Sequence, residues 1–314
     1  MELSVLDFDT PGTVVDFVSV LDGLGYRRYW LGEHHSHFQC ANPVLLGALL
    51  AGATEGIRVG SGGVCLTYHS PYKVAEDARL IEFMLPDRFD LGVTRGLDLD
   101  EAVASAMLDG QPRRDYQEKF ADLHGFVTGR LPADHPLHGR KPYLEDAPPI
   151  WMLGLGSGSA RLAARFGTGL CFSLHHAPVE IDGVALIDEY RRNFEPSPEF
   201  PEPAVIIAIS CICADTEAKA REYQEDYGRF VDGYAPELRE KVFKTPMIVG
   251  SPEQCRKAFT DICERYGTNE IMIADLLGNH RYAERLEMFR LLASECGLAP
   301  RFEQEEMALA VEEA

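Results

Sequence analysis

The sequence predicts an α/β fold in which eight parallel strands alternate with helices and close into a (β/α)8 TIM barrel. Eight short apolar runs recur along the chain, and segments with helical periodicity separate them. The length of 314 residues suits a barrel, which typically has about 250 residues plus insertions. An open, doubly wound sheet would show the same alternation, but eight repeats favour the closed barrel.

The expected strands are rich in β-branched, aromatic and aliphatic residues and are bounded by polar or glycine-containing segments. They are Leu3–Phe8, Tyr29–Leu31, Ile57–Val64, Phe89–Val93, Ile150–Leu153, Gly169–Leu174, Val205–Cys213 and Glu270–Asp275. The expected helices are Val14–Leu24, Pro43–Thr54, Tyr72–Leu85, Ala160–Phe166, Thr216–Val231, Pro252–Tyr266 and Arg281–Cys296. Start signals such as Ser251-Pro252-Glu253 support these helices.

We expect one domain over residues 1–314, with two insertions that interrupt the strand–helix alternation. Residues 97–149 follow the fourth strand, and residues 176–203 follow the sixth. In a barrel, both would lie as lids near the C-terminal face, where sites are built. The acidic tail, residues 300–314, is expected to fray or to pack as a helix against a neighbour.

The charge and the cysteines limit the possible partners and compartment. A net charge of −20 argues against a nucleic acid or an anionic membrane surface as partner, since both need a clustered positive face. No apolar run approaches the roughly 20 residues of a membrane span, and no signal peptide opens the chain. The eight cysteines form no Cys-x-x-Cys pair, so we expect free thiols in a reducing cytoplasm.

A histidine-rich string, Glu33-His34-His35-Ser36-His37, follows the second expected strand. Histidine suits proton transfer near neutral pH, so His34 and His35 are candidates for acid–base catalysis or substrate contact. A structural role is the alternative. A metal pair at His35 and His37 is a further possibility, but the later histidines His175-His176 and His280 lack a matching pattern of acids. We therefore expect no metal.

Two glycine-containing segments suggest a bound mononucleotide. Gly62-Gly63 ends the third strand, where missing side chains mark either a tight turn or the close approach of a flat ring. Gly154–Ser159 leads from the fifth strand into a helix, whose free N–H groups favour an anion. The third glycine of a dinucleotide fingerprint is misplaced, and the next strand ends without an acid for a ribose. A single phosphate therefore fits better.

Arg95, after the fourth strand, is the expected countercharge for that phosphate, since a guanidinium can grip it by two hydrogen bonds. Glu76 is expected to orient Arg95, and a plain salt bridge is the alternative reading. A phosphate, a ring on bare backbone at Gly62-Gly63 and nearby histidines together suggest FMN.

In order along the chain, a set of motifs resembles the bacterial luciferase-like flavin monooxygenase family. The motifs are Trp30–His35, Asn42-Pro43, Gly60–Val64, Ala75-Glu76-Asp77, Arg88–Gly96, Gly154–Ser159 and Ile248–Pro252. The resemblance runs from Met1 to about Leu292. It implies a (β/α)8 barrel, usually a homodimer, that receives reduced FMN from a separate NAD(P)H:flavin reductase.

The resemblance also implies roles for individual residues. Phosphate contacts are implied for Arg95, Gly156, Ser157 and Ser159, and isoalloxazine contacts for Gly62 and Gly63, often through a cis peptide bond. His34 matches the catalytic histidine of the family, and His35 its neighbour. Thr94 stands where luciferase itself has a cysteine near the flavin, and Asp98 near a flavin-contacting tyrosine, so light emission is not implied.

The implied activity is oxygenation of a small organic substrate through a flavin 4a-hydroperoxide. Two alternatives stay open: a flavin- or deazaflavin-dependent hydride-transfer oxidoreductase, and a non-catalytic FMN-binding protein. The intact Glu33-His34-His35 favours catalysis, because a carrier needs no proton-transfer group. The sequence does not identify the substrate. The helices Pro43–Thr54 and Tyr72–Leu85 carry small and apolar residues that would suit packing against a partner or against the barrel.

Overall fold

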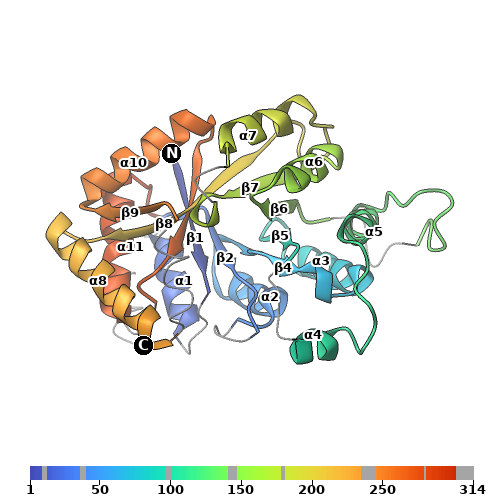
Figure 1. Ribbon diagram of the computed structural model, residues 1–314, viewed down its shortest axis with the longest axis horizontal. Coiled ribbons are helices and arrows are strands. Elements are labelled where there is room, and N and C mark those ends of the chain that lie inside the picture. The colour runs from blue at the N-terminus through green and yellow to red at the C-terminus, as the bar shows by residue number, and fades with distance from the viewer. Residues whose placement is uncertain are drawn as a thin grey trace.

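The chain forms a closed barrel of eight parallel strands surrounded by helices (Figure 1). The computed structural model describes residues 1–8, 13–35, 40–96, 101–140, 147–177, 181–234, 245–278 and 281–301. The barrel strands are β1 (Glu2–Asp7), β2 (Arg28–Leu31), β3 (Arg58–Ser61), β5 (Phe89–Thr94), β6 (Ile150–Gly154), β7 (Gly169–Ser173), β8 (Val205–Cys213) and β10 (Glu270–Asp275). Because β10 pairs with both β1 and β8, the barrel closes. All eight predicted strands are confirmed.

Two short strands extend the sheet at the C-terminal ends of longer ones. The predicted third strand breaks at Gly62-Gly63, and β4 (Val64–Cys65) continues it beside the end of β5. A strand that was not predicted, β9 (Met247–Gly250), pairs with the last four residues of β8. The break in the third strand therefore places Gly62-Gly63 where the strands end, which is the end of a barrel that carries its sites.

All seven predicted helices are present. They are α1 (Val14–Gly23), α2 (Pro43–Ala53), α3 (Pro71–Met84), α6 (Ser157–Arg165), α8 (Glu217–Tyr234), α10 (Pro252–Tyr266) and α11 (Tyr282–Cys296). Local chemistry explains their starts: Asn42 Oδ1 accepts a hydrogen bond from Leu45 N, and Ser251 forms a capping box with Gln254.

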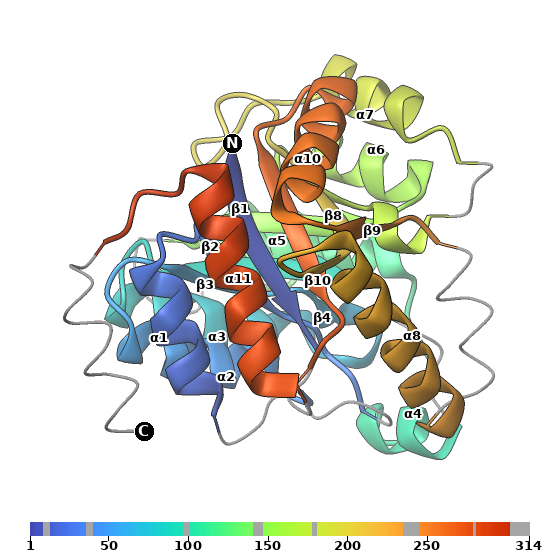
Figure 2. The ribbon, with the colours of Figure 1, turned by 90° about the vertical axis from the view of Figure 1, so that its left-hand side faces the viewer.

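The two segments expected as insertions contain three helices that were not predicted. These are α4 (Glu101–Met107) and α5 (Tyr116–Thr128) after β5, and α7 (Gly183–Arg192) after β7. Asp115 caps α5 by accepting from two backbone N–H groups, and Gly129 ends it with φ +73°. Figures 1 and 2 show β1 running down from the N-terminus and α4 at the lower end, where the strands finish. The segment after β5 thus reaches the C-terminal end of the barrel.

Alternate strand residues point into the barrel and form an apolar interior layer. Leu6, Trp30, Trp151, Leu153 and Met272 pack there, and the two tryptophan rings meet edge to face at 6.1 Å. The residues between them, such as Leu3 and Val5, pack outward against the helices. This period of two is what a closed, filled barrel requires.

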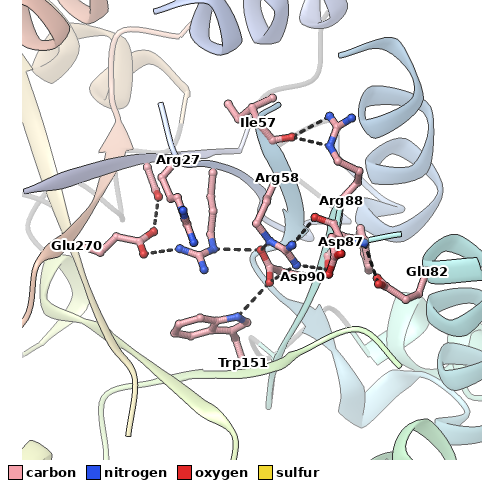
Figure 3. A network of polar contacts seen from close by, with 12 residues as sticks. Arg27, Ile57, Arg58, Glu82, Asp87, Arg88, Asp90, Trp151 and Glu270 are labelled. Atoms are coloured by element: carbon pink, nitrogen blue, oxygen red, sulfur yellow. Dashed lines mark hydrogen bonds and ion pairs between the residues drawn. The ribbon is translucent and has the colours of Figure 1, made fainter. Parts of the chain in front are cut away.

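A buried polar network closes the N-terminal end of the barrel (Figure 3). Asp90 accepts hydrogen bonds from Arg28 Nε at 3.0 Å, Arg58 Nε at 2.8 Å and Trp151 Nε1 at 3.3 Å. Arg28 also pairs with Glu270. Burial alone would raise the pKa of Asp90, but the two guanidinium groups outweigh it and lower that pKa. The network is therefore a charged plug at the end opposite the candidate site. In the described part of the chain, no helix is long and apolar enough to cross a membrane.

Candidate active site

Glu33, directly after β2, is the hub of the histidine cluster. Its side chain is almost fully buried, and its Oε1 lies 2.6 Å from His35 Nε2 and 2.7 Å from His69 Nε2. Its Oε2 accepts a hydrogen bond from Cys65 N in β4 at 2.9 Å. Burial would raise the pKa of Glu33, but the bonds from His69, Cys65 and His35 lower it below its usual range. Glu33 therefore stays a carboxylate and joins the end of β2 to the segment after β3.

His34 and His35, the predicted catalytic residues, are both half-buried at the end of β2. The backbone N–H of His34 donates to Cys40 O at 2.8 Å, and its ring meets Phe8 edge to face at 5.2 Å. The ring of His35 is held by Glu33. The structure thus gives both imidazoles fixed surroundings at the C-terminal end of the barrel, as an acid–base role requires.

His69 belongs to this cluster, and sequence reasoning missed it. It follows the short 3-10 turn Leu66–Tyr68, which in turn follows β4. The sequence did carry a signal, because a histidine that shortly follows a barrel strand lies at the face that carries sites. His37, His280 and Asp98, also considered from the sequence, lie outside the described residues.

Gly62 and Gly63 lie at the break between β3 and β4, and the bond between them is a cis peptide. A Cβ on Gly63 would lie 3.0 Å from Gly92 O, and one on Gly62 would lie 2.9 Å from the side chains of Leu6 and Trp30. Only glycine fits at either position without displacing its neighbours. The result is a stretch of backbone without side chains at the mouth of the barrel.

The N-terminus of α6 offers an anion site. Gly156 is its N-cap and has no side-chain capping bond, and an added Cβ at Gly156 or Gly158 would meet nothing within 4 Å. Free N–H groups at a helix start attract anions. Gly156 and Ser157 also line an open pocket of about 440 Å³, which Ile181 and residues of α7 complete. Ser159, by contrast, turns its hydroxyl toward Gly154.

Contacts connect Arg95 with the strand that leads to this helix. The Arg95 guanidinium lies over the Tyr116 ring at 5.7 Å, and Tyr116 Oη contacts Met152 Sδ in β6 at 3.2 Å. Thr67 Oγ1 donates to Arg95 O at 2.6 Å, and Lys119 Nζ donates to Thr67 O at 2.8 Å. Arg95 is exposed. These contacts place Arg95 beside α5, and its role as countercharge for an anion at α6 stays a prediction.

Glu76 and Thr94 were both predicted to contact or support the cofactor. Within the described residues, Glu76 lies 3.8 Å from Lys73 Nζ, and no contact with Arg95 is present. Orientation of Arg95 by Glu76 therefore stays a prediction without support from the contacts. Thr94 ends β5 opposite Cys65 in register, half-buried beside β4.

His175 is a further imidazole at the C-terminal end of the barrel, after β7. It is buried, and its Nδ1 lies 3.2 Å from Ala208 O. Burial, together with the adjacent His176, lowers the pKa of His175 to about 3, so its ring is neutral at physiological pH. Because Nδ1 donates to a carbonyl, Nε2 is an acceptor, and it has no hydrogen-bond partner among the described residues.

Among the described residues, one group has the composition and spacing of metal ligands: Glu33, His35 and His69, whose ligand atoms lie within 4.8 Å of one another. This group differs from the His35 and His37 pair considered from the sequence. Two histidines and one carboxylate can bind a transition metal. The hydrogen bonds within the group are shorter than the spacing of two ligands around a zinc ion.

A family model described as luciferase-like monooxygenase matches residues 4–270. The chain belongs to the luciferase-like monooxygenase family. Protein YceB of Bacillus subtilis (strain 168) is 35% identical over 286 residues, which cover 82% of this chain and 86% of that protein. The N-acetyl-S-alkylcysteine monooxygenase of the same organism is 30% identical over 295 residues, or 84% of this chain and 86% of that protein.

Solved structures of luciferase-like monooxygenases and their relatives share the fold. The apo structure of MsnO8 superposes with a TM-score of 0.80 at 29% identity, covering 96% of this chain and 99% of that one. Two more distant structures carry cofactors. The oxygenating constituent of 3,6-diketocamphane monooxygenase from Pseudomonas putida, in complex with FMN, has a TM-score of 0.69 at 19% identity and covers 96% and 99% of the two chains. An F420-dependent secondary alcohol dehydrogenase has a TM-score of 0.67 at 15% identity and covers 94% and 98%.

Proposed function

We propose that this luciferase-like protein is a two-component monooxygenase that uses reduced FMN and dioxygen to oxygenate a small organic substrate. A separate NAD(P)H:flavin reductase would supply the reduced FMN. The observation that carries the proposal is the uncapped start of α6, which opens on a pocket and follows β6, the strand whose Met152 contacts Tyr116, the ring that the exposed cation Arg95 overlies. This arrangement suits one phosphate group, as FMN has.

The residues present fit FMN at two points. The free N–H groups after Gly156, the Ser157 hydroxyl and Arg95 would hold the phosphate. The Gly62-Gly63 backbone would lie against the flat ring, although the missing Cβ atoms point toward Leu6, Trp30 and Gly92, so that close packing of the strands explains the two glycines. When bound, reduced FMN supplies the electrons that activate dioxygen.

The remaining residues would handle protons and water. His34 and His35 would donate or accept a proton at an imidazole nitrogen. The segment that carries α4 would cover the mouth of the barrel and exclude water, as a lid does. The aliphatic, sulfur-containing or aromatic nature of the substrate is not part of the proposal.

The second candidate is hydride transfer with a deazaflavin, which the shared fold of the F420-dependent alcohol dehydrogenase keeps open. The two candidates differ in their use of oxygen. Oxygen consumption driven by reduced FMN, with one oxygen atom recovered in product, belongs to the first alone. Substrate-dependent reduction of F420 without oxygen belongs to the second.

Flavin binding tests the proposed phosphate site. Arg95→Ala should weaken FMN binding by about 10- to 100-fold, the expected loss for a charge-assisted hydrogen bond. Binding of riboflavin, which lacks the phosphate, should change little. Arg256→Ala is the matched control, since that arginine pairs with Glu295 on the helical exterior. If wild-type protein bound riboflavin as tightly as FMN, the phosphate site would be wrong.

Turnover tests the histidines. His34→Ala should lower the oxygenation rate by about 10²- to 10⁴-fold while flavin binding remains, since a proton-transfer group contributes that much. Unchanged product formation with flavin bound would remove His34 from the mechanism.

We further propose that the protein is a homodimer in the cytoplasm. α2 and α3 share an exposed apolar face that a second copy would cover, made by Leu45, Leu49, Leu80, Phe83 and Met84, each 41–65% exposed. All eight cysteines are free thiols, which suits a reducing compartment.

A further inference from the structure

The Glu33 cluster has a feature that the proposed function does not use: one carboxylate oxygen serves two imidazoles. We infer that Glu33 is a positioning residue that holds His35 and His69 in the same tautomer, with Nε2 protonated and Nδ1 left as the proton-accepting atom of each ring. The catalytic role of these tautomers rests on the proposed function, whereas the tautomers themselves do not depend on it.

The geometry fixes the hydrogen positions. Glu33 Oε2 accepts the Cys65 N–H, so the carboxyl group faces donors on that side. Oε1 lies at 2.6 Å from one Nε2 and 2.7 Å from the other. An ionised carboxylate only accepts hydrogen bonds, so each Nε2 must carry a hydrogen. In a neutral imidazole the other nitrogen, Nδ1, is then the acceptor.

The same distances separate this arrangement from a metal site. A zinc ion holds oxygen and nitrogen ligands at about 2.0–2.1 Å, so two ligands of a tetrahedral site lie roughly 3.3 Å apart. Both Oε1–Nε2 separations are well below that value. Hydrogen bonds therefore hold the three groups together, and metal binding would require the groups to move apart.

The three side chains of the cluster differ in their exposure to solvent. The His69 side chain is 31% exposed, that of His35 is 13% exposed and that of Glu33 is 1% exposed. His69 can therefore exchange protons with solvent, while His35 stands next to His34 in the site. Glu33 orients both rings, as carboxylates commonly orient catalytic imidazoles. By this assignment His69 is also a positioning residue, because its hydrogen bond fixes the oxygen that holds His35.

Nitrogen-15 NMR of histidine-labelled protein at pH 8 reads the tautomers directly. We expect His35 and His69 to be protonated at Nε2. His138 and His175 are internal references, since each places Nδ1 against a backbone carbonyl, at 2.8 Å and 3.2 Å, and should show the opposite tautomer. Single variants His35→Asn and His69→Asn assign the signals. Protonation of His35 or His69 at Nδ1 in the wild-type protein would overturn the inference.

Glu33→Gln tests whether the carboxylate sets the tautomers of His35 and His69. A carboxamide has one acceptor oxygen, and the backbone N–H of Cys65 is a donor that cannot change, so we expect the oxygen to stay with Cys65 N and the NH2 group to face the ring nitrogens. At least one of the two rings should therefore switch to the Nδ1–H tautomer, while His138 and His175 stay unchanged. His69→Gln keeps an N–H donor near the place of Nε2, toward Oε1, so His35 should keep its wild-type tautomer in that variant. Unchanged tautomers in folded Glu33→Gln would contradict the inference.

Two further measurements separate this inference from its alternatives. Zn²⁺ titrated into the full-length protein should bind no more tightly than to His69→Ala. One-to-one binding that His69→Ala abolishes would make the cluster a metal site and overturn the inference. With active enzyme, Glu33→Gln should move the pH dependence of turnover, whereas His69→Gln, which keeps the donor to Glu33, should leave it closer to wild type. Expected tautomers without any oxygenation would refute the proposed function and leave this inference standing.

Discussion

Individual residues at the C-terminal end of the barrel differ in how burial sets their charge. Glu33 stays ionised because three hydrogen-bond donors surround it, whereas His175 stays neutral because burial opposes its protonation. His124, on α5 near the starts of β6 and β7 rather than at that end, behaves like His175: burial and Arg130 lower its pKa to about 4. These two histidines should therefore dominate the response of stability to mild acid.

His175→Gln tests this response. Between pH 6.5 and about 3 the unfolded chain binds a proton at position 175 that the folded protein does not. The free energy of unfolding should therefore fall as the pH drops below 6.5, by up to about 1.4 kcal/mol per pH unit for each such histidine. A glutamine amide can still donate to Ala208 O, so the variant should show a shallower fall in urea titrations at pH 7, 6 and 5. Identical slopes for variant and wild type would contradict the burial argument.

At the residue scale, sequence patterns identified the histidines after β2 but not their partner. His34 and His35 stood in a recognisable string, and Gly62-Gly63 was notable because two glycines end a strand. The contact between Glu33 and His69 joins residues 36 positions apart. The pairing of β2 with β3 and the placement of β4 bring them together, so no local pattern reports the contact.

At the scale of elements, α2 and α3 carry the face that the proposed dimer would bury. Leu49 on α2 and Met84 on α3 are 63% and 65% exposed. Replacing both with glutamate should convert a dimer into a folded monomer, because buried charges without partners are costly. Light scattering after size-exclusion chromatography checks the mass, and Val15→Glu, at an exposed apolar position on α1, is the control. A wild-type monomer, or a double variant that stays dimeric, would contradict the assignment.

The elements themselves were predicted where periodicity was strong and missed where turn residues interrupted it. The eight strands follow from short apolar runs. α5 was missed among the glycines and prolines of residues 97–149, although Asp115 and Gly129 mark its ends. α7 was missed for the same reason, because it lies among the prolines of residues 176–203. β9 was missed because its four residues, of which Gly250 alone is buried, give too short a pattern to distinguish from a turn.

At the scale of the whole molecule, the barrel separates a plugged N-terminal end from a functional C-terminal end. Arg28, Arg58 and Asp90 come from three strands, so their bonds tie the barrel wall together. Asp90→Asn would leave the buried Arg28 and the half-buried Arg58 without their shared carboxylate, and should lower the free energy of unfolding by about 3–5 kcal/mol. Asp261→Asn, which breaks an exposed pair with Lys257, should cost less than about 1 kcal/mol.

Denaturant unfolding compares the two aspartate variants. FMN binding should survive in folded Asp90→Asn, because the network lies at the opposite end of the barrel from the candidate site. A loss of stability no larger than that of Asp261→Asn would show that the plug is not a major support of the barrel.

The most direct test of the monooxygenase account is a rapid-mixing experiment with photoreduced FMN and oxygenated buffer, with and without the protein. We expect the protein to delay the return of oxidised flavin absorbance relative to free FMN and to lower the yield of hydrogen peroxide when substrate is present. Flavin that reoxidises at the rate of free FMN, with a full yield of hydrogen peroxide, would contradict the account and favour hydride transfer or flavin storage.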